Sequence, residues 1–201
     1  MVKIENVDGG LIINFSSGFE YDYIGIFALS FKELIHRDTL FNYVKSLEGP
    51  FKIQFLNVNS IASWRHVASA AMRALRSFKY GQNISDKIEI ELLLYCSGKR
   101  QIKDALNIVG LSEFIDSVVL VIFGSSNHFI HKVLNDFLSV FKAELSFDLL
   151  INLSMDRIEN LMKIFNVDKN ELDSIIKSGL SVDKALEYIL IERGSALEVY
   201  K

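Results

Sequence analysis

The sequence contains very little cysteine and proline, and it has no long apolar run. Its single cysteine, Cys96, excludes an internal disulfide and a zinc site built from several thiolates. With Pro50 as the only proline, turns must depend on glycine and asparagine. The longest apolar runs, such as IELLLY and VVLVIF, have the length of strands and are too short to span a membrane. The first ten residues, MVKIENVDGG, lack the apolar stretch of a secretion signal, so we expect a cytoplasmic protein.

Hydrophobic residues, by contrast, are plentiful. Half of the 201 residues are hydrophobic and 15 are phenylalanine, which is enough to build a sizeable core. Strand-like and helix-like segments alternate at first, and short capped helices follow one another later. We therefore predict an α+β fold in which a mixed β-sheet is covered by α-helices, with a core domain at residues 1–153. Residues 154–201 are predicted to form a C-terminal helical segment that packs on this core.

The apolar pattern also predicts the individual elements. A hairpin is expected at Asp8–Gly9–Gly10, because this turn signal separates two strand-like runs. Strands are predicted at residues 2–7, 11–15, 51–57, 87–96 and 116–123, with a further candidate at 149–153. Helices are predicted at residues 30–47, 61–80, 98–109 and 125–141, and after the capping residues Ser154, Asp168 and Ser181.

The predicted helix at residues 61–80 carries an unusual charge pattern. One side is apolar, and the other side groups Arg65, His66, Arg73 and Arg76 without a single acid between residues 61 and 81. Like charges at helical spacing repel each other, and solvated helix faces usually mix signs. Residues 61–103 hold eight Lys or Arg against three acids, whereas the whole chain has a formal charge of −3. Such a basic patch on an acidic protein suits a polyanion, although an arginine-rich solvated face remains the simpler alternative.

A second basic feature is the segment SGKRQI at residues 97–102, which is predicted to connect a strand to a helix. Lys99 and Arg100 would lie in the first helical turn, where cations oppose the helix dipole. A bound anion would reverse this balance, and Gly98 would let it approach the backbone. Alone, this segment is a weak signal that an ordinary turn would also explain.

Several motifs that follow one another in a fixed order identify a protein family more specifically than any single motif does. Small residues and His66 follow helical spacing along residues 63–74, and G-x-N-I-S comes next at residues 81–85. The pattern E-x-L-L-Y-x-S-G-x-R-Q-I occupies residues 91–102, and a predicted helix then ends near Gly110. This ordered pattern resembles the kinase-binding subunit of the KEOPS complex (the PRPK-binding protein TPRKB family, archaeal type). The resemblance is sharpest over residues 61–110 and gives little support to the first sixty residues.

The resemblance implies a non-catalytic subunit that binds a PRPK-type protein kinase alongside other KEOPS subunits. The complex supports threonylcarbamoyladenosine (t6A) modification at tRNA position 37, and archaeal relatives hold the single-stranded 3′ CCA end of tRNA. At the positions of this sequence that match the motifs, the resemblance implies tRNA contacts by Arg65, His66, Arg73, Arg76, Lys99, Arg100 and Gln101. Cations along a backbone and flat groups against bases are what a single-stranded nucleic acid requires. Tyr80 is a further candidate flat group on the same face.

The final helix is apolar almost to the last residue, whereas chain ends are normally polar and frayed. An apolar end must pack on its own domain or on a partner. The residues alone favour packing on its own domain. The resemblance instead implies that the apolar side binds the kinase, through Leu186, Ile189, Leu190, Leu197 and Tyr200. Gly194 departs from the bulkier residue expected there, and it indicates a kink or a close contact.

Two alternatives remain open. One is a small enzyme that uses His66 with Arg65 and Arg100 on a phosphorylated substrate, although no nucleophile, phosphate loop or acidic pair has a recognisable spacing. His128 and His131 lie three residues apart, but no pattern completes a metal site, so neither a metal nor a cofactor is expected. The other alternative is a scaffold that binds only proteins, with its basic patch against an acidic partner.

Overall fold

The computed structural model describes residues 2–7, 9–15, 18, 20–177 and 179–198. The chain divides into two compact units, each built from two stretches of sequence. We call residues 1–58 and 111–148 the sheet unit, and residues 59–110 and 149–201 the helical unit. Among the described residues, no helix combines the length and the apolar character that crossing a bilayer would require.

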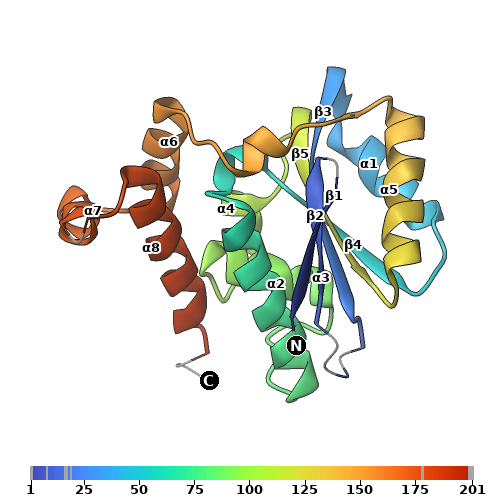
Figure 1. The fold of residues 1–201 in the computed structure, drawn as a ribbon, viewed down its shortest axis with the longest axis horizontal. Coiled ribbons are helices and arrows are strands. Elements are labelled where there is room, and N and C mark those ends of the chain that lie inside the picture. The colour runs from blue at the N-terminus through green and yellow to red at the C-terminus, as the bar shows by residue number, and fades with distance from the viewer. Residues whose placement is uncertain (1, 8, 16–17, 19, 178, 199–201) are drawn as a thin grey trace. The chain divides into compact units, whose positions relative to one another are not determined.

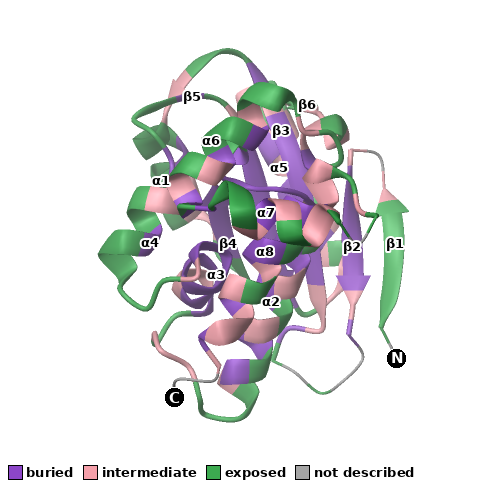
Figure 2. Ribbon diagram, turned by 90° about the vertical axis from the view of Figure 1, so that its left-hand side faces the viewer, coloured by how far each residue is buried: buried purple, intermediate pink, exposed green. Residues whose placement is uncertain are grey.

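The sheet unit contains one antiparallel sheet. Its main path runs in the order β1-β2-β3-β5-β4, and β6 pairs with β3 beside this path. Each pair along the path is antiparallel, and Figure 1 labels the strands that form it. The strands are β1 (Lys3–Val7), β2 (Gly10–Asn14), β3 (Tyr23–His36), β4 (Phe51–Leu56), β5 (Phe114–Gly124) and β6 (Glu144–Leu145). The outer strand β1 is largely exposed, whereas β5 and the first part of β3 are mostly buried (Figure 2).

Helices α1 (Arg37–Ser46) and α5 (Asn127–Phe141) lie on the same side of this sheet in Figure 1. Alternate residues of the strands point toward them, since successive side chains of a strand face opposite ways. The resulting core is rich in aromatic rings. The ring of Phe137 in α5 meets the rings of Phe55 and Tyr43 edge to face, with centroid distances of 5.6 Å and 5.0 Å. Burying aromatic surface of this kind is a large favourable contribution to folding.

The helical unit is formed around α8. Its helices are α2 (Trp64–Lys79), α3 (Ile88–Ser97), α4 (Ile102–Val109), α6 (Met155–Phe165), α7 (Lys169–Ile176) and α8 (Val182–Ala196). Helix α8 packs against α2, α3, α6 and α7, while α3 also packs against α2 and α4. Short 3-10 helices at Val58–Ser60 and Phe147–Leu150 lie where the chain passes from one unit to the other.

The predicted α+β class is confirmed, and the sheet is antiparallel in these pairings rather than mixed. The hairpin between β1 and β2 is confirmed by their register, in which Val7 pairs with Gly10. The caps at Ser154 and Asp168 are also confirmed, because each side chain accepts a backbone N–H of its helix. Helix α8 begins after Ser181, as predicted.

Three element predictions were wrong. Residues 88–97 form helix α3, where a strand was predicted at residues 87–96, because a short and mainly apolar run fits either structure. Residues 30–36 continue strand β3, and the helix begins only at Arg37, where the His36 side chain caps it. Residues 147–150 form a 3-10 helix, and the last strand is β6, just before it.

The chain also clusters differently from the predicted division at residue 153. Helices α2, α3 and α4 belong to the same unit as α6, α7 and α8, not to the unit of the sheet. The reason is physical, because α8 packs directly on α2 and α3 and shares their apolar surfaces. The predicted packing of residues 154–201 on the core did not identify which helices they would contact.

Candidate functional site

Helix α2 carries most of the predicted nucleic-acid site. It begins at Ser63, whose hydroxyl accepts the backbone N–H groups of Arg65 at 3.1 Å and His66 at 3.3 Å. This arrangement is a standard N-cap and fixes the start of the helix. Because α2 is covered by both α3 and α8, its two predicted faces are not simply one buried and one exposed side.

His66 is buried, so its predicted place on an exposed face is wrong. Its side chain is 1% exposed, and Nε2 lies 2.9 Å from the backbone carbonyl oxygen of Cys96 in α3. The backbone N–H of Ala62 donates to Nδ1 at 3.4 Å, which leaves Nε2 as the donor toward Cys96. Burial lowers the pKa of His66 to about 4, although the Cys96 carbonyl and Glu187 oppose the shift. His66 therefore holds α2 to α3 as a neutral imidazole and offers no open ring to a base.

The buried histidine also bears on the enzyme alternative. A general acid–base group works best with a pKa near the operating pH and within reach of substrate, and His66 meets neither condition. Within the described parts of the chain, no group of three or more His, Cys, Asp or Glu side chains could hold a metal ion.

Two arginines of α2 have acidic neighbours, which come from α8 and from the turn that follows it. The Arg65 guanidinium is half exposed, at 51%, and lies 4.5 Å above the Trp64 ring and 3.9 Å from Glu187. Arg73 is only 24% exposed, and its Nη1 lies 2.8 Å from the Glu198 carboxylate. Residues 61–81 themselves contain no acid, but the folded chain brings carboxylates to this face from more than a hundred residues away in sequence.

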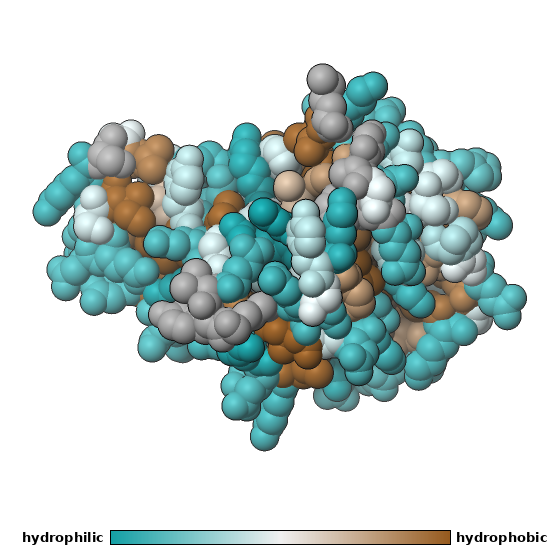
Figure 3. Space-filling view, turned by 90° about the horizontal axis from the view of Figure 1, so that it is seen from below, coloured by the Kyte–Doolittle hydropathy of each residue, from teal (hydrophilic) through white to brown (hydrophobic). Residues whose placement is uncertain are grey.

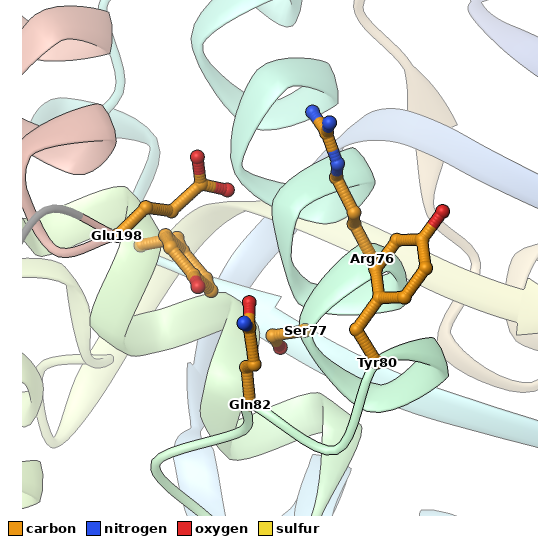
Figure 4. Close-up of a pocket in the computed structure, with 6 residues that line it drawn as sticks. Arg76, Ser77, Tyr80, Gln82 and Glu198 are labelled. Carbon is orange, nitrogen blue, oxygen red and sulfur yellow. The ribbon is translucent and has the colours of Figure 1, made fainter. Parts of the chain in front are cut away.

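Arg76 differs from the other two arginines. It is exposed, and it has no ion pair among the residues that the structure describes. It lines a pocket of about 360 Å³ at the C-terminal end of α2, which Figure 4 shows from close by. The lining residues are Arg76, Ser77, Tyr80, Gln82, Tyr95 and Glu198. Of these, the sequence indicated only Arg76 and Tyr80, since Gln82, Tyr95 and Glu198 reach the pocket from other segments.

The loop beside this pocket is held by Glu91, which is completely buried. Its carboxylate accepts the Ser77 hydroxyl at 3.0 Å and the backbone N–H groups of Ile84 at 3.0 Å and Ser85 at 2.9 Å. A buried carboxylate is tolerated only with such partners. The motif G-x-N-I-S at residues 81–85 and the glutamate that follows it therefore work together, because Glu91 holds the loop after α2 in place.

The turn around Gly98 contains the other predicted cations. Gly98 adopts a left-handed conformation (φ 64°) at the end of α3, and α4 begins only at Ile102. Lys99, Arg100 and Gln101 therefore lie in the turn before the helix, and all three are exposed.

The seven predicted residues do not form one patch. Cys96, two residues before Gly98, contacts His66 in the first turn of α2, so the Gly98 turn lies toward the start of that helix. Arg76 lies ten residues further along α2, which corresponds to about 15 Å of helix.

The predicted kinase anchors on α8 are also largely buried. Leu186, Ile189, Leu190 and Leu197 are at most 6% exposed, and α8 packs on α2, α3, α6 and α7. The anchor at Tyr200 lies outside the described residues. Gly194 marks a close contact rather than a kink, because a Cβ atom there would lie 2.5 Å from the carbonyl oxygen of Tyr95. The apolar side of α8 is thus used within its own unit.

A different side of α8 remains open. Tyr188 is 56% exposed, and with Ile191, Glu192 and Ser195 it lines an open groove of about 460 Å³. Ile175 and Leu180 complete the groove. In Figure 3, one of the groups of hydrophobic side chains lies at the left edge of the view, over α7. An apolar groove beside an exposed tyrosine is typical of a protein-binding surface.

Comparison with known proteins complements this geometry. No curated protein matches the chain. The family model described as kinase binding protein CGI-121 matches residues 31–191, a span that contains α2, the Gly98 turn and most of α8. Since this span is well over half of the sequence, the chain belongs to the kinase-binding protein CGI-121 family.

Proposed function

We propose that this protein is a non-catalytic KEOPS subunit that binds a PRPK-type kinase and the single-stranded 3′ CCA end of tRNA. It would thereby support t6A modification at tRNA position 37, alongside the other KEOPS subunits in the cytoplasm. The observation that carries the proposal is the kinase-binding family match over residues 31–191. The motifs that resemble KEOPS subunits all fall inside that span.

For the kinase contact we propose the open groove of α8 in place of the buried anchors. Its apolar residues Ile175, Leu180 and Ile191 surround the exposed ring of Tyr188. Tyrosines that become buried in a partner's pocket contribute strongly to binding, whereas residues already buried contribute none of their surface. The groove can therefore bind a partner without unfolding α8.

Replacing Tyr188 with aspartate tests this surface. We expect Tyr188→Asp to weaken binding of the PRPK-type kinase by at least about tenfold in a titration, as for other interface tyrosines. Met155→Asp on α6 is a matched control, because Met155 is also an exposed hydrophobic residue of the helical unit. Equal kinase affinity for Tyr188→Asp, for the control and for the unchanged protein would rule out the groove. Deleting α8 would be less informative, since the other helices pack on it.

For the tRNA contact we propose the exposed members of the predicted set. Arg65, Arg76, Lys99 and Arg100 supply cations, and Gln101 supplies an amide for a base edge. Tyr80, which is 63% exposed, supplies the flat surface that the buried His66 does not. Cations that follow a backbone, together with an aromatic surface for stacking, suit a single strand. His66 enters this proposal only as the residue that positions α2.

Charge reversal at the two ends of this site tests it. Arg76→Glu and Arg100→Glu should each weaken binding of tRNA and leave kinase binding unchanged. Lys132→Glu on α5 provides the same type of charge reversal at an exposed position outside the site. Affinity for the unchanged protein should fall linearly with the logarithm of salt concentration. Equal affinity for tRNA with and without its CCA end would contradict the 3′-end assignment.

One observation favours a scaffold that binds only proteins. Arg65 and Arg73 already lie near Glu187 and Glu198, so part of the basic face is neutralised internally. If the unchanged protein binds its kinase but fails to bind tRNA at low salt, the scaffold alternative is correct.

A further inference from the structure

The ion pair between Arg73 and Glu198 lies beside the pocket at the end of α2. Arg73 Nη1 and Glu198 Oε2 are 2.8 Å apart, and Glu198 also lines the pocket across from Arg76 and Tyr80 (Figure 4). Arg73 Nε is buried and has no hydrogen-bond partner in the described part of the chain. The guanidinium of Arg73 is therefore only partly satisfied by Glu198.

The remaining lining residues suit an anionic ligand with a flat ring. Arg76 follows Arg73 by three residues, so the two cations lie on the same side of α2. Apart from Glu198, the described residues that line the pocket include no acid. Tyr80 adds an exposed aromatic ring, and Gln82 adds an amide that can both donate and accept. A cation, a stacking surface and an amide together match a nucleotide, and about 360 Å³ lies within the usual range of small-ligand pockets.

Glu198 is placed where it can leave. Helix α8 ends at Ala196, and Glu198 lies in the turn that follows, where its N–H donates to the carbonyl of Ser195 at 3.1 Å. Leu197 beside it is buried and keeps the backbone in place, so Glu198 can leave Arg73 by rotation of its own side chain. The Glu198 side chain is 33% exposed, and water and a competing anion can therefore reach it. Glu198 also lies beyond the span of the family match.

We propose that Glu198 is an internal competitor for RNA, occupying Arg73 until the 3′-terminal nucleotide of a single strand enters the pocket. The entering phosphate takes the place of the Glu198 carboxylate beside Arg73 and Arg76, and the base stacks on Tyr80. This inference rests on the proposed function, because it assumes that the strand is the 3′ end of tRNA. Beyond that function, it assigns the terminal nucleotide to this pocket. It also implies that the Glu198 carboxylate lowers the affinity of the protein for RNA.

The test measures binding of a fluorescently labelled single-stranded RNA that ends in CCA, by anisotropy. Glu198→Gln keeps the shape of the side chain and removes its charge, so it should tighten binding up to about fivefold, the range of partly exposed ion pairs. Glu192→Gln is a matched control, since it removes the same charge from an exposed position of α8. Thermal unfolding of each variant checks that the fold is intact.

Combining Glu198→Gln with Arg73→Gln gives the decisive comparison. Arg73→Gln should weaken binding, and adding Glu198→Gln should then have no further effect, because the carboxylate acts through Arg73. The proposed competition is contradicted if Glu198→Gln raises the affinity for RNA no more than the Glu192→Gln control does. It is also contradicted if Glu198→Gln raises the affinity equally in the Arg73→Gln background. In both cases RNA binding itself would remain supported. If neither the unchanged protein nor any variant binds the RNA at low salt, the tRNA part of the proposed function fails as well.

Discussion

At the scale of single residues, His66 makes stability depend on pH. The unfolded chain takes up a proton at His66 near pH 6.5, whereas in the folded state burial lowers the pKa to about 4. Between these values the unfolded state binds more protons, so the free energy of unfolding should be highest above pH 6.5 and decrease as the pH falls toward 4. Over the whole range between the two pKa values, this difference corresponds to a loss of about 3 kcal/mol in the free energy of unfolding.

Chemical denaturation at pH 7 and pH 4.5 measures this loss. Carboxylates also titrate in this range, so the informative quantity is the difference between the unchanged protein and His66→Gln. The variant should be less stable at pH 7, because it disturbs the hydrogen bond to Cys96, and it should lose less stability on acidification. Parallel pH profiles for the two proteins would contradict a neutral buried imidazole.

Glu91 gives a second prediction at the residue scale. Glu91→Gln replaces one carboxylate oxygen with an NH2 group, which cannot accept the N–H groups of Ile84 and Ser85. Leaving buried donors unsatisfied should cost about 2–3 kcal/mol in the free energy of unfolding. Glu159→Gln on α6, an exposed position, should change it by less than about 0.5 kcal/mol. An equally small effect of Glu91→Gln would mean that the loop after α2 does not depend on this carboxylate.

These residues show what a helical pattern can and cannot predict. The spacing correctly placed Arg65 and Arg76 on exposed positions of α2. It could not show that His66 points into α3, nor that Glu187 and Glu198 approach the arginines, because those contacts join residues far apart in sequence. Local periodicity reports the direction of a side chain on its own helix, but not what covers it.

At the scale of elements, the contact between α3 and α8 depends on Gly194. Alanine favours a helix over glycine by about 1 kcal/mol, so Gly194→Ala would stabilise an isolated α8. In the protein, the added methyl group would lie 2.5 Å from the backbone oxygen of Tyr95, which cannot move without shifting α3. We therefore expect a net destabilisation of about 1–3 kcal/mol, measured by urea denaturation.

Ser195→Ala is the control for this substitution. Ser195 lies next to Gly194 but on the side of the open groove, and its hydroxyl donates within α8, to the carbonyl of Ile191. It should change stability by less than about 0.5 kcal/mol. A stabilising effect of Gly194→Ala would show that α3 and α8 are not in close contact.

The elements themselves were predictable where a local signal exists. Capping residues correctly marked the starts of α6 and α7, since an N-cap acts on its own helix. Helix α3 was missed because its residues are apolar on nearly every side, so neither a helical nor a strand period stands out. Two signals favoured the helix, namely glutamates in its first turn and Gly98 at its C-terminal end.

At the scale of the whole molecule, the interleaved units predict the result of truncation. A chain that ends at residue 153 would keep α2 and α3 but lose α8, which packs on both. Their apolar surfaces would be exposed, and we expect aggregation and strong binding of a hydrophobic dye rather than a folded domain. Size-exclusion chromatography and dye fluorescence, with the full chain as control, measure this. A monomeric truncated chain that unfolds cooperatively would contradict the division into these two units.

The order of strands in the sheet has a consequence for the newly made chain. Among the described strands, β4 pairs with β5 alone, and β5 lies between β3 and β4. Ribosomes deliver β4 first and then α2, α3 and α4 before β5 emerges. Until then β3 and β4 each carry an edge without its final partner, and pairing across so long a stretch is slow. This is the period of synthesis in which the nascent protein is most exposed to wrong strand pairing and most dependent on protection by chaperones.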